Sequence, residues 1–137
     1  MTDSANLDLV RSIYADWERG DFSSAEWADA EIEYVIAGGP EPGQWTGRAA
    51  MARAAGANAA LSTWYDTRGQ VEDLRELDGE RVLALDRWTG RGKASGLDLR
   101  QSPLLCAHLF IIRNGKVTHL TAYFERDRAL ADLGLDA

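Results

Sequence analysis

The sequence predicts an α+β domain in which helices come first and an antiparallel meander of strands comes last. Residues 7–17 repeat apolar side chains at helical spacing, whereas the period changes to two from residue 65 onward. Asn114-Gly115 then separates two long apolar runs, which is the strongest short-range signal for a β-hairpin. With no internal repeat or linker, residues 1–137 are expected to form one domain.

The first half of the chain is expected to supply the helices. A first helix would run from Asn6 to Gly20 and carry one apolar stripe, made of Leu7, Val10, Tyr14 and Trp17. Ser23-Ser24-Ala25-Glu26 has the form of a capping box and would open a short second helix. After a strand at 32–36 and a loop at 38–47, the alanine-rich residues 48–64 are expected to form a third helix.

The second half of the chain is expected to be mainly strands. Residues 65–77 and 81–89 would pair across an Asp78-Gly79 turn. Gly90, Gly92 and Gly96 predict a loop or a frayed hairpin end, and Pro103 places a bulge or a sheet edge in the strand over 97–112. A last strand at 117–124 precedes a short helix at 126–133.

A two-residue turn at Asn114-Gly115 would set Arg113 opposite Lys116 and so determine the register of the hairpin. One face would then be wholly apolar and pair Leu109 with Leu120, Ala107 with Ala122 and Leu105 with Phe124. The other would pair Phe110 with His119, His108 with Thr121 and Cys106 with Tyr123. Both faces are too apolar to meet water, so both require cover.

Composition excludes several kinds of partner. The net charge is −7 and there is no cluster of lysine or arginine, so we expect no nucleic-acid partner. Residues 1–20 lack the features of a signal peptide and the apolar runs are short, so we expect no membrane association. The single cysteine, Cys106, fits a reducing compartment, and we expect a cytoplasmic protein.

Four stretches together resemble a known family. They are Tyr14–Asp21 (YADWERGD), Trp27–Tyr34 (WADAEIEY), Trp45-Thr46-Gly47, and the ending NGKVTHLTAYFERDRALADLGL. They are similar to the nuclear-transport-factor-2-like (NTF2-like) superfamily and its SnoaL-like branch. The resemblance implies a cone-shaped α+β barrel, in which a curved, mostly antiparallel sheet wraps about three N-terminal helices. It also implies a conical pocket on the concave side and a homodimer through the convex side.

Two activities found in this superfamily are not supported residue by residue. Ketosteroid isomerases use a tyrosine on the first helix, which matches Tyr14. Their general base falls on Tyr34, and their second oxyanion donor falls on Ala107, before His108. A tyrosine is a poor base at neutral pH and alanine donates nothing. We therefore expect no ketosteroid isomerisation.

Limonene-epoxide-hydrolase-like enzymes use an Asp-Arg-Asp set, of which only Asp86 is present here. The positions of the arginine and the second aspartate are occupied by Ala84 and Ala122. Alternation places Ala84, Asp86 and Trp88 on one face of their strand, and the resemblance implies that this face lines the pocket.

Asp86 is therefore the candidate general acid or base, with Tyr14 as a hydrogen-bond donor. The resemblance implies further pocket-lining residues, which are Trp17, Trp27, Tyr34, Trp88, Ala107, Leu109, Leu120, Ala122 and Phe124. Aromatic walls suit a hydrophobic, partly planar small molecule. The alternatives are a structural aspartate paired with an arginine such as Arg48, and aromatic residues that are simply core.

Two classes of function stay open. One is an enzyme acting on a hydrophobic molecule, whether isomerase, cyclase, dehydratase or hydrolase. The other is a non-catalytic ligand binder or dimeric adaptor. We expect neither metal nor cofactor, and place His108 and His119 on the convex face. There they would join Cys106, Phe110, Ile112 and Tyr123 in an apolar homodimer interface.

Overall fold

The chain folds around one curved sheet. The computed structural model describes residues 5–18, 26–37, 43–51, 64–92 and 104–135. Within them, six strands form a mixed sheet in the order β2-β1-β6-β5-β4-β3. The β1 and β6 strands pair in parallel and the other neighbours are antiparallel. In chain order the elements are α1 (Ala5–Glu18), β1 (Ala28–Ala37), β2 (Gly43–Thr46), β3 (Trp64–Glu76), β4 (Arg81–Gly92), β5 (Leu104–Arg113), β6 (Lys116–Tyr123) and α4 (Arg126–Asp132).

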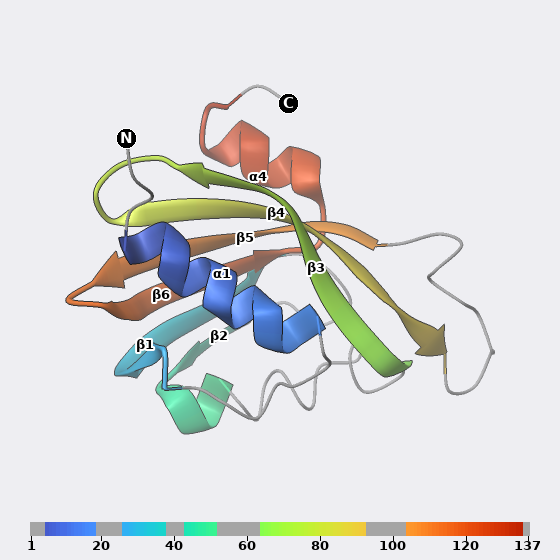
Figure 1. Ribbon diagram of the computed structural model, residues 1–137, viewed down its shortest axis with the longest axis horizontal. Helices are drawn as coiled ribbons and strands as arrows, with labels where there is room; N and C mark the ends of the chain where they lie inside the picture. Colours follow the sequence, from blue (N-terminus) through green and yellow to red (C-terminus); the bar gives the residue numbers. More distant parts are fainter. Residues whose placement is uncertain (1–4, 19–25, 38–42, 52–63, 93–103, 136–137) are drawn as a thin grey trace.

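The helices α1 and α4 cover opposite sides of the sheet. Figure 1 shows α1 crossing the concave side, which we call the inner face, and α4 lying over the other side, the outer face. No helix in the described part of the chain is long and apolar enough to cross a bilayer. The α+β class and the cone-like arrangement expected from the sequence are confirmed.

Most predicted elements are present, although several differ in extent. A short edge strand, β2, occupies part of the expected loop at 38–47. Trp64 begins β3 instead of ending the third helix, of which residues 48–51 are helical. Gly90 and Gly92 lie within β4, so the strand is longer than predicted. The predicted second helix is wrong at its described end, because Glu26 and Trp27 form a turn and β1 already begins at Ala28. Residues 23–25, residues 52–63 of the third helix, and the loop with Gly96 and Pro103 lie outside the described residues.

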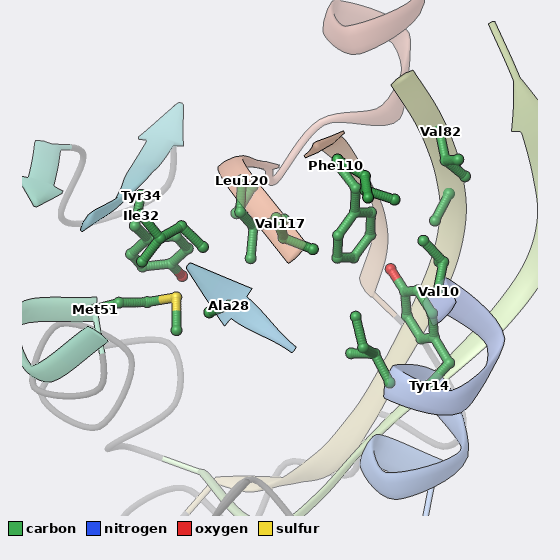
Figure 2. Close-up of a cluster of buried hydrophobic side chains, with 14 of the residues drawn as sticks. Val10, Tyr14, Ala28, Ile32, Tyr34, Met51, Val82, Phe110, Val117 and Leu120 are labelled. Carbon is green, nitrogen blue, oxygen red and sulfur yellow. The ribbon is translucent and has the colours of Figure 1, made fainter. Parts of the chain in front are cut away.

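The larger hydrophobic cluster fills the inner face. It joins the apolar stripe of α1 to inward side chains from β1, β4, β5 and β6. Figure 2 shows Val10 and Tyr14 of α1 pointing toward Phe110 and Val82, while Tyr34 and Met51 lie at the far end of the same cluster. A second cluster on the outer face packs α4 against the sheet and contains Leu83, Leu85, Ala107, Tyr123, Ala129 and Leu130.

The hairpin between β5 and β6 differs from its predicted register because of a β-bulge. The turn is as expected, with φ of 54° at Asn114 and 74° at Gly115, and Arg113 pairs with Lys116. Ile112 then faces Val117, but Ile111 faces His119, so Thr118 is an extra residue in β6. Beyond the bulge every pair is shifted by one residue. A shift of one residue reverses which side chains share a face.

Because of the bulge, the side chains of β5 lie on the faces opposite to those predicted. Phe110 pairs with Leu120 and His108 pairs with Ala122, so these side chains share the inner face. Cys106, Phe110 and Ile112 are buried, Tyr123 packs under α4, and His119 is exposed. The prediction that these residues form an exposed apolar patch for a homodimer is therefore wrong. The homodimer itself stays a prediction.

Truncating Phe110 should test this placement. Phe110 is fully buried, so Phe110→Ala should lower the free energy of unfolding by about 3–5 kcal/mol, as expected for cavity formation in a core. Leu105 lies in the same strand and is 47% exposed, so Leu105→Ala serves as the control and should cost less than about 1 kcal/mol. Chemical denaturation measures both, and equal losses would contradict the inner position of Phe110.

Candidate functional site

A buried aspartate is the centre of the site. Asp86 lies in the apolar strand β4, and the alternation of β4 turns its side chain to the inner face, where it is 0% exposed. Its Oδ2 accepts a hydrogen bond of 2.6 Å from the hydroxyl of Tyr14. The Nδ1 of His108 lies 2.6 Å from the same oxygen. Among the described residues, Oδ1 has no hydrogen-bond partner and no lysine or arginine side chain contacts the carboxylate.

Tyr14 reaches Asp86 because α1 docks its apolar stripe on the sheet. The tyrosine is 1% exposed, and its ring packs edge-on against Phe110 with centroids 6.1 Å apart. Burial, together with the nearby charge and hydrogen bond of Asp86, raises the pKa of Tyr14 well above its usual value. The phenol is therefore neutral at physiological pH and donates a hydrogen bond to the carboxylate.

His108 joins the site through the pairing of β5 with β4. It lies opposite Ala84, two residues from the Asp86–Cys106 pair, so its ring shares the inner face with the carboxylate. Its Nδ1 is buried and does not form a hydrogen bond of standard geometry, although it touches Oδ2. The side chain as a whole is 10% exposed. A carboxylate at Nδ1 favours the tautomer with the proton on that nitrogen.

Aromatic rings surround these three side chains. The Trp17 ring lies between several others, with centroids 4.9 Å from Tyr14, 5.7 Å from Trp88 and 6.2 Å from Trp27. The ring of His108 lies 5.8 Å from Trp17 and 5.9 Å from Trp88. The environment is therefore apolar, and the interaction between Asp86 and its two partners is stronger than it would be in water.

Cys106 pairs with Asp86 across β4 and β5 and is 4% exposed. Burial, and secondarily the charge of Asp86, raises the pKa of its thiol. A thiol that resists ionisation is a poor nucleophile and behaves as a small apolar side chain. Cys106 therefore contributes packing beside the carboxylate.

The structure brings most of the predicted pocket residues to the inner face. Those that belong to the inner cluster are Trp17, Trp27, Tyr34, Trp88, Leu120, Ala122 and Phe124. Tyr34 lies in β1, with β6 between it and β5, and its ring packs on Trp45 with centroids 6.0 Å apart. Ala107 and Leu109 were predicted wrongly. They lie on the outer face with the α4 cluster, because the Thr118 bulge reverses the faces of β5 relative to β6.

His108 is a residue of the site that was predicted on the wrong face. The two histidines were expected together on the convex face, but only His119 is exposed and His108 is in the site. The sequence of β5 held a clue to this, because every second residue is one of Cys106, His108, Phe110 and Ile112, and these side chains share one buried face. Extending β5 from its pairing with β4 would have placed His108 beside Asp86, whereas extending it from the hairpin turn did not.

The described residues around this site do not form a metal centre. There, no group of three or more His, Cys, Asp or Glu side chains is arranged to hold a metal ion. An open pocket of about 500 Å³ lies beside α1, lined by residues that include Asp16, Trp27 and Lys116. Trp27 connects this pocket to the aromatic cluster, because its ring packs against Trp17 with centroids 6.2 Å apart.

Removing the Tyr14 hydroxyl tests its bond to the buried carboxylate. Tyr14→Phe should lower the free energy of unfolding at pH 7 by about 1.5–3 kcal/mol, the usual value for a hydrogen bond to a charged group. Tyr34→Phe removes another buried hydroxyl, one without a hydrogen bond to any described residue, and should cost less than about 1 kcal/mol. Urea unfolding of both variants gives the comparison. A Tyr14→Phe protein as stable as wild type would contradict the bond.

Tyr34 should make stability depend on alkaline pH. Burial raises the pKa of Tyr34 from 10.0 to about 12, so the native state holds this proton more tightly than the unfolded state. The resulting stability is complete below pH 10 and is lost as the pH rises through about 12, in total roughly 3 kcal/mol. Tyr34→Phe should therefore show a shallower loss of stability above pH 10 than wild type. Parallel curves would contradict the burial of this hydroxyl.

Comparison with known proteins places the fold. No protein-family model matches the chain, and no curated protein matches it in sequence. The chain is similar to the solved structure of an NTF2-like protein of unknown function from Burkholderia pseudomallei, with a TM-score of 0.74 and 17% identity over 94% of this chain and 97% of that one. It is similar to TerC, co-crystallised with polyporic acid, with a TM-score of 0.73 and 19% identity over 95% and 98%.

A third similar structure is a candidate SnoaL-like polyketide cyclase from Jannaschia sp. CCS1. Here the TM-score is 0.69 and the identity is 16%, over 90% of each chain. At these identities the likeness concerns the fold, and function has to be argued from the site itself. The chain has the cone-shaped α+β fold of the NTF2-like and SnoaL-like proteins.

Proposed function

We propose that this protein is an acid/base enzyme that acts on a hydrophobic organic molecule, with His108 as the group that transfers the proton. The observation that carries the proposal is the contact of His108 Nδ1 and the Tyr14 hydroxyl with one buried oxygen of Asp86, each at 2.6 Å. A histidine oriented by a carboxylate is a common proton-transfer unit, because the carboxylate holds the tautomer and stabilises the imidazolium that forms.

Exposure favours His108 over Asp86 as the group that meets the ligand. Asp86 is 0% exposed, whereas the His108 side chain keeps 10% of its surface. Because Nδ1 is itself buried against Asp86, that remaining surface belongs to other atoms of the side chain. Asp86 then orients His108 and does not touch the substrate.

Tyr14 has a supporting role in this scheme. Its hydroxyl is committed to Asp86, and the residue is 1% exposed. A donor bound to the carboxylate stops it from rotating away from His108. Tyr14 therefore stabilises the orienting group, which differs from the sequence-based expectation that it would donate to the ligand.

The surroundings favour a neutral, hydrophobic substrate with an acidic C–H or O–H bond. Aromatic rings from Trp17 and Trp88 lie within 6 Å of the His108 ring, centroid to centroid. The buried carboxylate repels anions. Similar folds include proteins described as polyketide cyclases, and TerC was crystallised with polyporic acid. These support a substrate of aromatic or polyketide character, handled by isomerisation, cyclisation or dehydration.

The alternative is a non-catalytic pocket protein or dimeric adaptor in which the three polar side chains serve packing alone. A chain of this kind would hold His108 and Asp86 in place without turnover. Exchange of His108 for an uncharged side chain would then leave its binding of small molecules largely unchanged. Proton-transfer kinetics separate the two classes.

A generic substrate tests the base directly. 5-Nitrobenzisoxazole opens to a coloured phenolate when one proton is removed from its carbon, so turnover reports a base in an apolar site. If His108 is that base, His108→Gln should lower kcat/KM by about 10²–10⁴-fold, the usual contribution of general-base catalysis. The matched control is His119→Gln, which changes the exposed histidine and should leave the rate unchanged.

Asp86→Asn completes the test. It should also lower kcat/KM, because an amide no longer selects the Nδ1–H tautomer of His108. Turnover that survives His108→Gln but is lost in Asp86→Asn would return the base to Asp86. A wild-type protein without turnover, and without an organic ligand detected by native mass spectrometry, would favour the adaptor.

A further inference from the structure

We propose that Arg126 is a positioning residue that holds the backbone of Asp86 from the outer face, so that the carboxylate reaches both Tyr14 and His108. Arg126 is the first residue of α4 and lies on the side of the sheet away from the site. The inference deepens the proposed function, since it concerns how the same histidine is oriented.

The Arg126 side chain links three neighbouring strands. One terminal nitrogen, Nη2, donates to Glu72 Oε1 of β3 at 2.6 Å and to the carbonyl oxygen of Asp86 in β4 at 2.9 Å. Its Nε donates to the carbonyl oxygen of Cys106 in β5 at 3.4 Å. Asp86 and Cys106 are partners across β4 and β5, so the guanidinium bridges the backbone of Asp86 and that of its neighbour in β5.

The pairing of β3 with β4 is irregular next to Asp86, so a further contact that holds the strands together matters there. Val71 pairs with Asp86 and Asp73 pairs with Leu85, so Glu72 is an extra residue in β3. A bulge locally disrupts the ladder and bends the strand that contains it. The carboxylate of this extra residue is the one that binds Arg126, and it also lies 3.9 Å from Arg87 Nε.

The geometry suits arginine and no other side chain. A guanidinium presents five donors in one plane, and a carbonyl oxygen can accept a second hydrogen bond, so one side chain can satisfy acceptors on three strands. A lysine would supply the charge from a single nitrogen. The Arg126 side chain is 23% exposed, so the contact with Glu72 is shielded from water more than the surface pairs of this chain.

The consequence for the site follows from how few contacts hold Asp86. Within the described part of the chain its Oδ1 has no hydrogen-bond partner, and both of its side-chain contacts involve Oδ2. The position of that oxygen therefore depends on the backbone of β4. The positive charge of Arg126 also acts through the sheet, because it partly offsets the upward shift in the pKa of the Cys106 thiol. Functional groups need placement to within about 0.5 Å, which a backbone tie supplies.

The test reads the tautomer of His108 and does not depend on turnover. With ¹⁵N-labelled protein at about pH 8, the resonances of Nδ1 and Nε2 report which nitrogen carries the proton. Wild type should show the Nδ1–H form. Arg126→Met should shift both resonances toward the Nε2–H form, and Arg126→Lys should shift them in the same direction by less.

Arg128→Met is the matched control. Arg128 lies in the same helix and is 54% exposed, with its nearest acid Asp132 at 3.9 Å, so its loss removes the same charge without touching β4. It should leave both resonances in place. Glu72→Gln, which weakens the anchor of Arg126, should give a shift smaller than that of Arg126→Met.

Unchanged resonances in a folded Arg126→Met protein would overturn the proposal. If neither Arg126 variant folds, Glu72→Gln decides: a shift supports positioning, and wild-type resonances would assign Arg126 to stability alone. Failure of the proposed function is a separate result. It would appear as absent proton transfer in wild type, whatever the tautomer of His108.

Discussion

The burial of the Asp86 carboxylate in an apolar core is the constraint on which the rest of this structure depends. An ionised carboxylate without partners would cost several kcal/mol in such surroundings, and no lysine or arginine side chain among the described residues contacts it. Its compensation comes from Tyr14 and His108. Tyr14 lies on α1 and His108 lies on β5. The buried carboxylate is therefore compensated only when α1 is docked on the sheet and β5 is aligned with β4.

Core and site are therefore not separable in this fold. Tyr14 and Trp17 belong to the apolar stripe that docks α1, and they also contact the polar centre or its ring of aromatic side chains. A substitution there should change stability and chemistry together. Arg126 acts from the other side of the sheet, where changes can alter the site without entering the core. This division makes the outer face the better place to separate positioning from packing.

Much of the fold, and part of the site, could be predicted from the sequence. The α1 stripe, the Asn114-Gly115 turn and the shared face of Asp86 and Trp88 follow from local periodicity and turn chemistry, and the structure has all three. Tyr14 and Asp86 were paired through the resemblance to a family. Their hydrogen bond agrees with that pairing, although the order of roles proposed here is different.

The remaining features depend on tertiary contacts that no local pattern encodes. Thr118 is an ordinary strand residue by propensity, yet it is the extra residue of a bulge, and its position decides whether His108 faces in or out. Glu72 is the extra residue of a second bulge, and its partner Arg126 lies 54 positions away in the sequence. The edge strand β2 lies in a segment rich in glycine, where sequence favours a loop.

The most direct test of the central claim is a double-mutant cycle between Asp86 and His108, measured by chemical denaturation at neutral pH. If the two side chains form one buried unit, Asp86→Asn and His108→Gln should be non-additive, with a coupling energy of about 0.5–3 kcal/mol. Repeating the cycle with His119→Gln should give additive changes, because that histidine is exposed. Additive changes for Asp86 and His108 would contradict the contact on which the proposed chemistry depends.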